Sequence, residues 1–355
     1  MLPYIFFLIL LSASNIYDKT RFEKIIFLFL SLMLFAFSAF RVGGTGPGDY
    51  DAYLRLYSKV TTWEGVVDPT IHAELGFRLL SFMGNYAGFD GQFVIFIMAF
   101  LSAFPVMWLI NKYSNYPIGS LLIWIPYFLT MNMHSSRVSV AASFGLLFIV
   151  SFYKSKKLSS IVFFLLAFSF HSSAICLVFI FLTRFSFRYL VSFIIMSLLF
   201  GVLLNPLVFI ANIFEVVGMG HISWLITSYM SSEDYGYPMK IYDPRIILSF
   251  ITVFLIYNIR NSVVNRFDFY IFKVFLIGVI LMVGFSSVTI IAWRLSYFYL
   301  ISCVIVIPLI SKYYNERFFL SFGYIRLASL FFVFTYCLYA FPLILSSLPY
   351  KFYFL

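Results

Sequence analysis

Long apolar runs, each close to the length of a membrane span, constrain this chain more than any other feature. Hydrophobic residues make up 63% of its 355 residues, and charged residues only 11%. A helix needs about 20 apolar residues to cross a hydrocarbon core of about 30 Å. Inside that core the backbone must satisfy its own hydrogen bonds, which favours helices. The sequence therefore predicts an all-α, polytopic integral membrane bundle.

We predict about twelve spanning segments of this kind, arranged as a single transmembrane domain over residues 1–355. They lie near 1–16, 24–40, 91–110, 117–133, 137–153, 158–170, 173–183, 189–212, 244–259, 269–291, 294–311 and 326–348. Two longer loops, 41–91 and 214–243, are predicted on the outer side. Within the first, residues 74–89 are amphipathic and predict an outer-surface or re-entrant helix.

The Lys and Arg residues of the short loops set the orientation. With both termini outside, basic residues far outnumber acidic ones in the inner loops, whereas the two signs nearly balance in the outer loops. The net charge of +10 arises from basic residues spaced singly between apolar runs. That pattern encodes membrane orientation and argues against a nucleic-acid partner. The segments between 117 and 183 are shorter than a full span, so we predict a cavity open to the outer side.

Three arginines each begin a helix that runs from the outer to the inner side: Arg137, Arg245 and Arg294. Unpaired backbone amides and the positive end of the helix dipole favour an anion at such a position. A guanidinium binds phosphate oxygens in a bidentate way, so several of them converging on one pocket would suit a diphosphate. The competing interpretation is that each arginine snorkels to lipid headgroups.

The glycine-rich stretch from Arg41 to Tyr53 lacks the Gly-Lys-Ser/Thr signature of a nucleotide-binding loop. One interpretation is a flexible turn. The other is a sugar-binding surface, in which carboxylates accept hydrogen bonds from sugar hydroxyls and aromatic faces pack on the sugar rings. The candidate sugar-binding residues are Asp49, Tyr50, Asp51 and Tyr53.

Histidine supplies the other candidate chemistry. His171, in Phe-His-Ser-Ser, is either a packing residue bonded to a serine or a general base, since neutral imidazole accepts a proton near pH 7. His134 precedes Arg137 by three positions and is predicted at the floor or wall of the cavity. The histidines lack metal-ligand spacing and the three cysteines lie singly in apolar runs, so we predict neither a catalytic metal nor a cofactor.

Four stretches, in this order along the chain, carry a resemblance to a known family: Arg41 with Gly48-Asp49-Tyr50-Asp51-Ala52-Tyr53, Ser136-Arg137-Val138-Ser139-Val140-Ala141, Phe170-His171-Ser172-Ser173-Ala174-Ile175, and Arg294-Leu295-Ser296-Tyr297-Phe298 followed by Pro308. Together they resemble the polysaccharide polymerase family that includes EpsG-like and Wzy-type O-antigen polymerases. The chain departs from the family pattern at Gly44–Pro47, which look like extra loop residues. It departs again at Val138, where a glutamine often follows the arginine.

The resemblance implies a multi-pass, metal-independent glycosyltransferase of the bacterial inner membrane that acts on the periplasmic face. It would transfer a growing glycan from undecaprenyl diphosphate to a hydroxyl of an incoming lipid-linked repeat unit, in contact with membrane lipid and with a chain-length regulator as a further partner. In this hypothesis Arg137 and Arg294 hold the diphosphate, assisted by Arg41 or Arg245. His171 or Asp49 is the base, and Tyr50 and Tyr53 grip the sugar.

Two alternatives stay open. A flippase for the lipid-linked oligosaccharide would also line a cavity with basic residues, but it needs ionisable groups in both halves of the bundle, and here Lys273 is the exception among nearly uncharged inner segments. A periplasmic ligase using the same lipid donor is the other. Loss of a flippase would leave lipid-linked units on the inner face of the membrane, whereas loss of a polymerase would leave them on the outer face.

Overall fold

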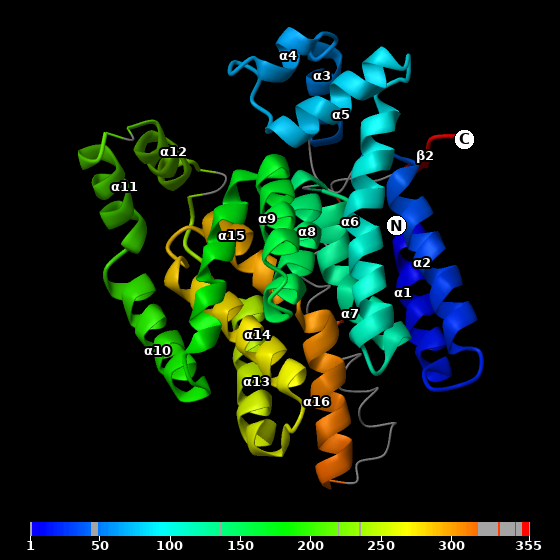
Figure 1. Ribbon diagram of the computed structural model, residues 1–355, viewed down its shortest axis with the longest axis vertical. Coiled ribbons are helices and arrows are strands. Elements are labelled where there is room, and N and C mark those ends of the chain that lie inside the picture. Colours follow the sequence, from blue (N-terminus) through cyan, green and yellow to red (C-terminus); the bar gives the residue numbers. More distant parts are fainter. Residues whose placement is uncertain are drawn as a thin grey trace. The chain divides into compact units, whose positions relative to one another are not determined.

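The computed structural model describes residues 2–43, 49–134, 136–218, 220–233, 236–318, 333, 345 and 350–354 (Figure 1). Helices dominate the described residues, which confirms the prediction of an all-α helical membrane protein. The contacts divide the chain into two compact units. The first comprises Met1–Ile175 and Cys303–Leu355, and the second Cys176–Ser302. The single transmembrane domain predicted over 1–355 stays a prediction.

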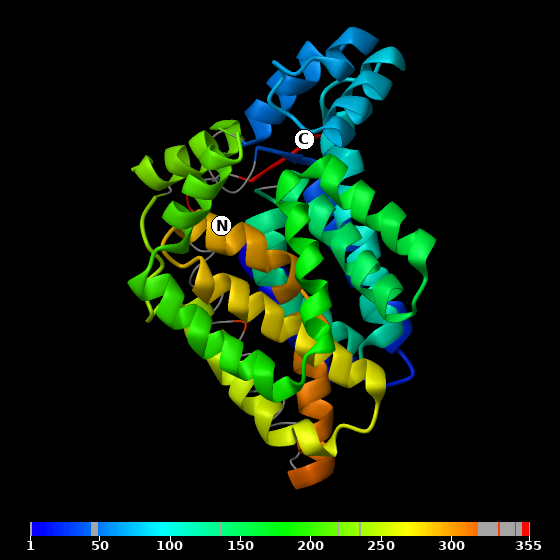
Figure 2. The same ribbon diagram turned by 60° about the vertical axis from the view of Figure 1, so that its left-hand side comes forward.

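The first unit contains most of the long helices. Its elements are α1 (Leu2–Ser14), η1 (Asn15–Tyr17), α2 (Glu23–Ala39), β1 (Arg41–Val42), α3 (Asp49–Lys59), α4 (Trp63–Val67), α5 (Leu75–Tyr86), α6 (Gln92–Tyr113), α7 (Pro117–Tyr127), the π-helical η2 (Phe128–Asn132), α8 (Ser136–Tyr153), α9 (Lys157–Phe170), α16 (Cys303–Phe318) and β2 (Lys351–Phe352). Figures 1 and 2 both show α3, α4 and α5 together beyond one end of α6, α8 and α9. These three helices are called the cap below.

The second unit is helical in its described part. Its elements are α10 (Phe187–Leu203), α11 (Pro206–Val216), α12 (Gly220–Ser231), α13 (Pro244–Ile259), η4 (Arg260–Ser262), α14 (Arg266–Gly284) and α15 (Thr289–Leu300), preceded by the 3₁₀ helix η3 (Ser172–Arg184), which starts in the first unit. The ammonium of Lys273 on α14 donates to the carbonyls of Thr183 at 3.0 Å and Phe185 at 2.9 Å. Lys273 therefore caps the C-terminal end of η3.

Most described helices follow the apolar segments of the sequence. The predicted segment 294–311 is wrong in detail: α15 begins at Thr289 and ends at Leu300, so Arg294 lies inside a helix and not at its start, and α16 begins at Cys303. Gln92–Tyr113, Ser136–Tyr153 and Arg266–Gly284 are each long and apolar enough to cross a membrane, and the number rises to five if two pairs of consecutive helices count as one span each. Pro3–Tyr17, Lys157–Phe170 and Ser172–Arg184 are shorter apolar helices. Most of the predicted segment 326–348 lies outside the described residues. The total of about twelve spans stays a prediction.

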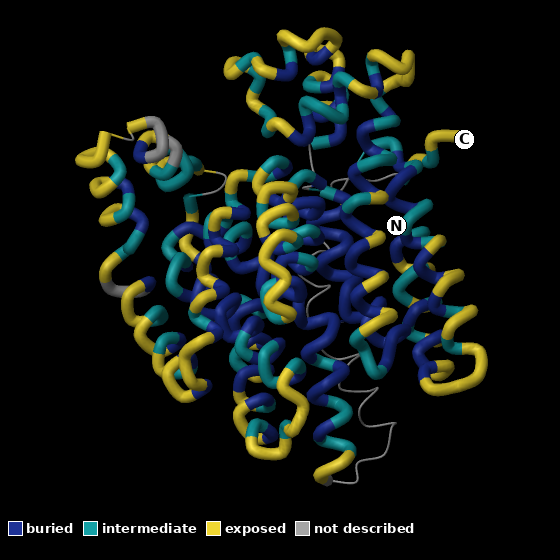
Figure 3. The backbone as a smooth tube through the Cα atoms, in the orientation of Figure 1, coloured by how far each residue is buried: buried dark blue, intermediate teal, exposed yellow. Residues whose placement is uncertain are grey.

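The first unit contains a fully buried helix and other helices that carry exposed residues (Figure 3). Every residue of α7 is buried. The carboxylate of Asp18 accepts hydrogen bonds from the backbone amides of Ile118 at 2.9 Å and Gly119 at 2.8 Å. It thereby caps the first turn of α7. On α1 and α2, Ile9 and Ile25 are instead exposed, as expected of side chains that face lipid.

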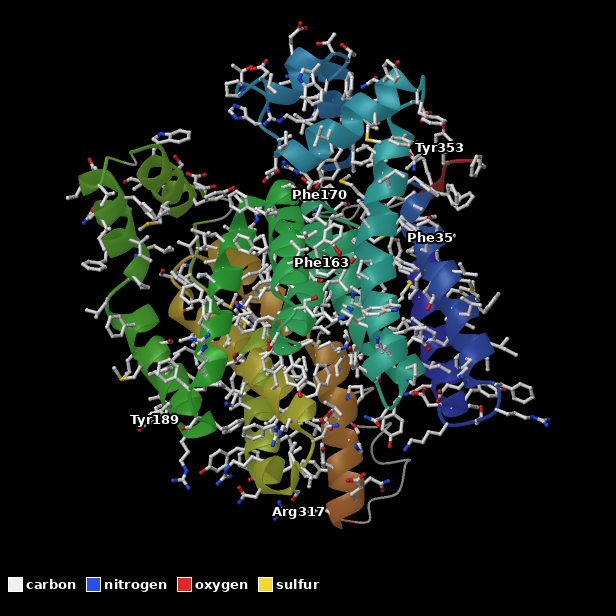
Figure 4. All side chains as sticks on the ribbon, in the orientation of Figure 1. Phe35, Phe163, Phe170, Tyr189, Arg317 and Tyr353 are labelled. Carbon is white, nitrogen blue, oxygen red and sulfur yellow. The ribbon has the colours of Figure 1, made fainter. Side chains whose placement is uncertain are left out.

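The cap packs on the end of the α8–α9 pair. A helix occupies Leu75–Tyr86 within the predicted amphipathic stretch 74–89, and it is not among the candidate spans of the described residues. A Cβ at Gly76 would lie 2.8 Å from the carbonyl oxygen of Ser169 and 3.1 Å from the ring of Phe170. Glycine is therefore needed for α5 to approach α9 this closely. Figure 4 marks Phe170 at that end of α9.

A short two-stranded sheet joins the C-terminus to the segment that precedes the cap. Strand β2 pairs antiparallel with β1, with Arg41 opposite Phe352 and Val42 opposite Lys351. The backbone amide of Tyr353 donates to the carbonyl of Phe40 at 2.8 Å. Figure 4 shows Tyr353 at this end of the unit. The backbone of Arg41 is thus held on one side by the C-terminal strand.

A candidate site of paired arginines at the start of α8

A buried polar network fixes the point where α8 begins. The side-chain amide of Asn132, at the end of η2, donates to the hydroxyl of Ser102 at 2.8 Å and accepts from that of Ser139 at 2.8 Å. The hydroxyl of Ser136 donates to the Asn132 carbonyl at 3.0 Å. All of these groups are buried, where a satisfied network gives a rigid local structure. A π-helical turn such as η2 often occurs at functional positions.

Arg41 reaches this network from β1. Its side chain is 2% exposed and donates from Nη2 to the Ser136 hydroxyl at 2.9 Å and from Nη1 to the Gly43 carbonyl at 2.7 Å. Its Nε is buried without a hydrogen-bond partner among the described residues. Burial lowers the pKa of Arg41 from its usual value, and the charges of neighbours that include Tyr53 and Asp49 oppose that change. A guanidinium starts from so high a pKa that it stays charged.

Arg137 follows Ser136 directly and carries the second guanidinium of the site. Its Nη1 forms an ion pair with the carboxylate of Glu74, the N-cap residue of α5. The guanidinium carbon lies 5.8 Å from the ring centre of Tyr53 and 5.9 Å from that of Phe77. The two side chains of the ion pair are 23% and 22% exposed, and Nε of Arg137 has no hydrogen-bond partner among the described residues. The ion pair is therefore partly accessible, whereas the Nε donor of Arg137 is buried.

Two buried tyrosines support the arginines. The Tyr50 hydroxyl donates at 2.7 Å to the side chain of Gln92, whose amide nitrogen donates to the carbonyls of Ala39 at 2.8 Å and Arg41 at 3.2 Å. Tyr53 is 4% exposed, and burial raises its pKa while Arg137 opposes the rise. Both rings are buried beside the arginines in this structure. The sugar-gripping role of Tyr50 and Tyr53 stays a prediction.

The two predicted carboxylates lie at the start of α3. Asp49 is the first residue of that helix and half-buried, and its charge acts on Arg41, Tyr53 and Arg137. Asp51 is exposed. Asp49 therefore belongs to the cluster around the two arginines, whereas Asp51 faces away from it toward solvent.

The histidines have local structural environments. His171 follows α9, and its Nδ1 accepts the backbone amide of Ser173 at 3.2 Å and lies 2.6 Å from the Ser173 hydroxyl. Because a backbone amide can only donate, Nδ1 carries a lone pair and the proton of the neutral ring sits on Nε2. In this arrangement His171 offers a hydrogen-bond donor and not a free basic nitrogen. His134 is half-buried in the turn between η2 and α8.

The other two predicted arginines belong to the second unit and differ from each other. Arg245 is 2% exposed, and Asp243 accepts from its Nε at 2.9 Å and from its Nη2 at 2.7 Å. Arg294 donates from Nη1 to the Tyr229 hydroxyl at 2.9 Å. Its Nε is buried without a hydrogen-bond partner among the described residues. The convergence of these arginines with Arg137 on one outer cavity stays a prediction.

Glu74 and Gln92 are functional candidates that the sequence did not single out. A glutamate before an amphipathic helix is an ordinary helix-start signal. Nothing local indicates that its partner lies 63 residues further along the chain. Among the described residues, no group of three His, Cys, Asp or Glu side chains is arranged to hold a metal ion.

The fold and site together define a multi-helix membrane protein with two arginines and two carboxylates clustered at the start of α8. A family model described as the EpsG family matches residues 24–352, nearly the whole chain, so the protein belongs to the EpsG family. This membership suggests a membrane polysaccharide polymerase-like role. The comparisons with curated proteins and with solved structures give no match.

Proposed function

We propose that the protein is a polysaccharide polymerase, a metal-independent glycosyltransferase that acts on lipid-linked repeat units. It transfers the growing glycan from its undecaprenyl diphosphate to a hydroxyl of an incoming undecaprenyl-diphosphate-linked unit. The reaction takes place on the periplasmic face of the bacterial inner membrane, within a cavity open to that side. A chain-length regulator is the proposed protein partner.

The observation that carries this proposal is the pairing of Arg41 with Arg137 at the start of α8. Ser136 accepts a hydrogen bond from Arg41 and directly precedes Arg137, and Asp49 and Tyr53 act electrostatically on both arginines, so the two belong to one cluster although they lie far apart in the sequence. When the bond between the sugar and the diphosphate breaks, negative charge grows on the departing diphosphate. Fixed guanidiniums stabilise such charge as it develops. For Arg294, in the second unit, diphosphate binding remains a separate proposal.

Proton transfer in the proposed reaction is assigned to Asp49. The acceptor hydroxyl must lose its proton as its oxygen attacks the sugar, and a carboxylate close to the arginines can take it. Asp49 acts electrostatically on both guanidiniums. His171 is the weaker candidate because its Nδ1 lone pair already accepts hydrogen bonds.

The test is Arg137→Ala in cells that make the polysaccharide. We expect long chains to disappear while single repeat units remain, because losing one charge-stabilising group lowers such rates by about 10²–10³-fold. Arg55→Ala is the matched control, since Arg55 is an exposed arginine of the same cap. Full-length polymer from the Arg137→Ala protein at normal expression would overturn the proposal.

The flippase alternative needs ionisable groups in both halves of the bundle. Lys273, the ionisable exception in the inner segments, uses its ammonium to cap the end of η3. A flippase defect would leave lipid-linked units on the inner face of the membrane, whereas a polymerase defect leaves them outside. The face of the membrane on which lipid-linked repeat units accumulate in the Arg137→Ala strain therefore distinguishes the two functions.

A further inference from the structure

The ion pair between Glu74 and Arg137 occupies the guanidinium that the proposed function assigns to a diphosphate. Glu74 is the N-cap residue of α5, but its side chain caps no backbone amide of that helix. It reaches Arg137 instead.

The geometry of this ion pair allows another anion to displace the Glu74 carboxylate. It joins one oxygen of Glu74 to Nη1 of Arg137, and Nε of Arg137 has no hydrogen-bond partner among the described residues. Both side chains are more than a fifth exposed. An anion arriving from outside can therefore reach the exposed part of the guanidinium and compete with Glu74 for it. The displaced carboxylate stays near the N-terminus of α5, where the helix dipole favours a negative charge.

The charges of the cluster determine which anions gain by the exchange. Arg41 and Arg137 are balanced by Asp49 and Glu74, so the site is neutral without a ligand. A phosphodiester headgroup of the surrounding lipid brings a single negative charge, the same as the carboxylate it would displace. A diphosphate bridge brings twice that charge, so it is attracted more strongly to Arg137 and, through space, to the buried Arg41.

We propose that Glu74 is a specificity-determining residue, a counter-anion that excludes singly charged phosphodiester headgroups from Arg137 and gives way to a lipid diphosphate. This inference rests on the proposed function, because it takes the diphosphate as the ligand of the arginine pair. It also explains how an arginine at a membrane boundary stays available when headgroups surround it. Without Glu74, Arg137 would be occupied by the lipid itself.

The test measures binding of farnesyl diphosphate to the full-length protein in nanodiscs. One set contains phosphatidylcholine alone, and the other equal parts of phosphatidylcholine and phosphatidylglycerol. For the wild type we expect phosphatidylglycerol to change Kd by less than about twofold. For Glu74→Gln we expect phosphatidylglycerol to weaken binding of the probe about tenfold, because the lipid headgroup then competes for Arg137. Glu64→Gln, an exposed glutamate of the same cap, should match the wild type.

Two further variants separate the possible failures. Glu74→Asp keeps the charge and should keep most of the discrimination, so a loss equal to that of Glu74→Gln would overturn the proposal. Binding by Glu74→Gln that ignores phosphatidylglycerol would overturn it as well. Arg137→Gln should bind the probe poorly in phosphatidylcholine alone. If it binds as the wild type does, the diphosphate site itself is wrong and the proposed function fails with it.

Discussion

Two ion pairs, one in each unit, begin from the same sequence signal and end as different structures. Arg137 and Arg245 both stand at the start of an apolar helix. Arg245 is bound through two of its nitrogens by Asp243, two residues away, and its guanidinium lies 5.1 Å from the ring centre of Trp293. Arg137 shares one nitrogen with Glu74, from a distant helix, and remains accessible.

The two pairs differ in how much of each guanidinium remains accessible to a ligand. A buried guanidinium with a bidentate carboxylate has no capacity left for a ligand, and removing either partner strands the other. A partly accessible pair can exchange its carboxylate for a substrate anion. The substrate-binding role predicted for Arg245 is therefore the weakest of the arginine assignments, because Asp243 already satisfies this side chain.

The largest expected effect is on the stability of the folded protein. Arg245→Ala should lower the stability of the protein by about 3 kcal/mol, because it leaves the largely buried Asp243 without its partner. A thermal melt in detergent measures the change. Polymer formation per folded molecule should stay near normal.

A double substitution controls for the stranded charge. Arg245→Met with Asp243→Asn removes both charges and keeps a side-chain oxygen to cap the amide of residue 245, as Asp243 does now at 2.9 Å. Stability should recover in large part. If Arg245→Ala unfolds at the wild-type temperature and yet abolishes long chains, as Arg137→Ala is expected to do, then Arg245 is a binding residue and not a structural one.

An intermediate effect is expected at Gln92, which holds the backbone of Arg41 and the hydroxyl of Tyr50. Gln92→Leu removes these hydrogen bonds at about 1 kcal/mol each, and a shifted Arg41 should lower polymerisation about tenfold. Asn85→Leu is the matched control: Asn85 makes a similar set of bonds to carbonyls in the cap, without contact to Arg41. Chain length per folded protein is the readout, and equal losses in both variants would show that Gln92 acts only through stability.

The smallest effect is expected at His171. Asparagine places an oxygen where it can accept the same backbone amide two residues on, so His171→Asn should retain activity within about twofold of the wild type. His171→Ala loses the acceptor and should be less stable. A dead His171→Asn enzyme with normal folding, together with a rate in the wild type that falls as pH drops through about 6.5, would restore His171 as the general base.

Much of the helical framework could be predicted from periodicity and hydropathy. Predicted segments near 24–40, 91–110 and 137–153 became α2, α6 and α8 with ends moved by a few residues. The break at His171 between two short helices was also correct. These features depend on local composition and on the thickness of a bilayer, both of which the sequence contains.

The partners of the candidate residues could not be predicted. The motif gives the spacing of Tyr50 and Tyr53 but not which face of α3 is covered. The packing of α5 on α9 at Gly76 and the ion pair of Glu74 with Arg137 are contacts between distant segments. Such contacts follow from how the helices are arranged, and no local signal encodes them.

Arg137 combines both kinds of information. The sequence by itself determined that a charge stands at the start of an apolar helix, and that its position demands a reason, because charge is expensive next to hydrocarbon. The tertiary structure adds that Arg41 belongs to the same cluster, that Glu74 is the ion-pair partner of Arg137 and that Asp243 binds Arg245 through two of its nitrogens. The physical cause is that burial and charge pairing are properties of the folded surroundings, so identical arginines at identical helix starts acquire different chemistry.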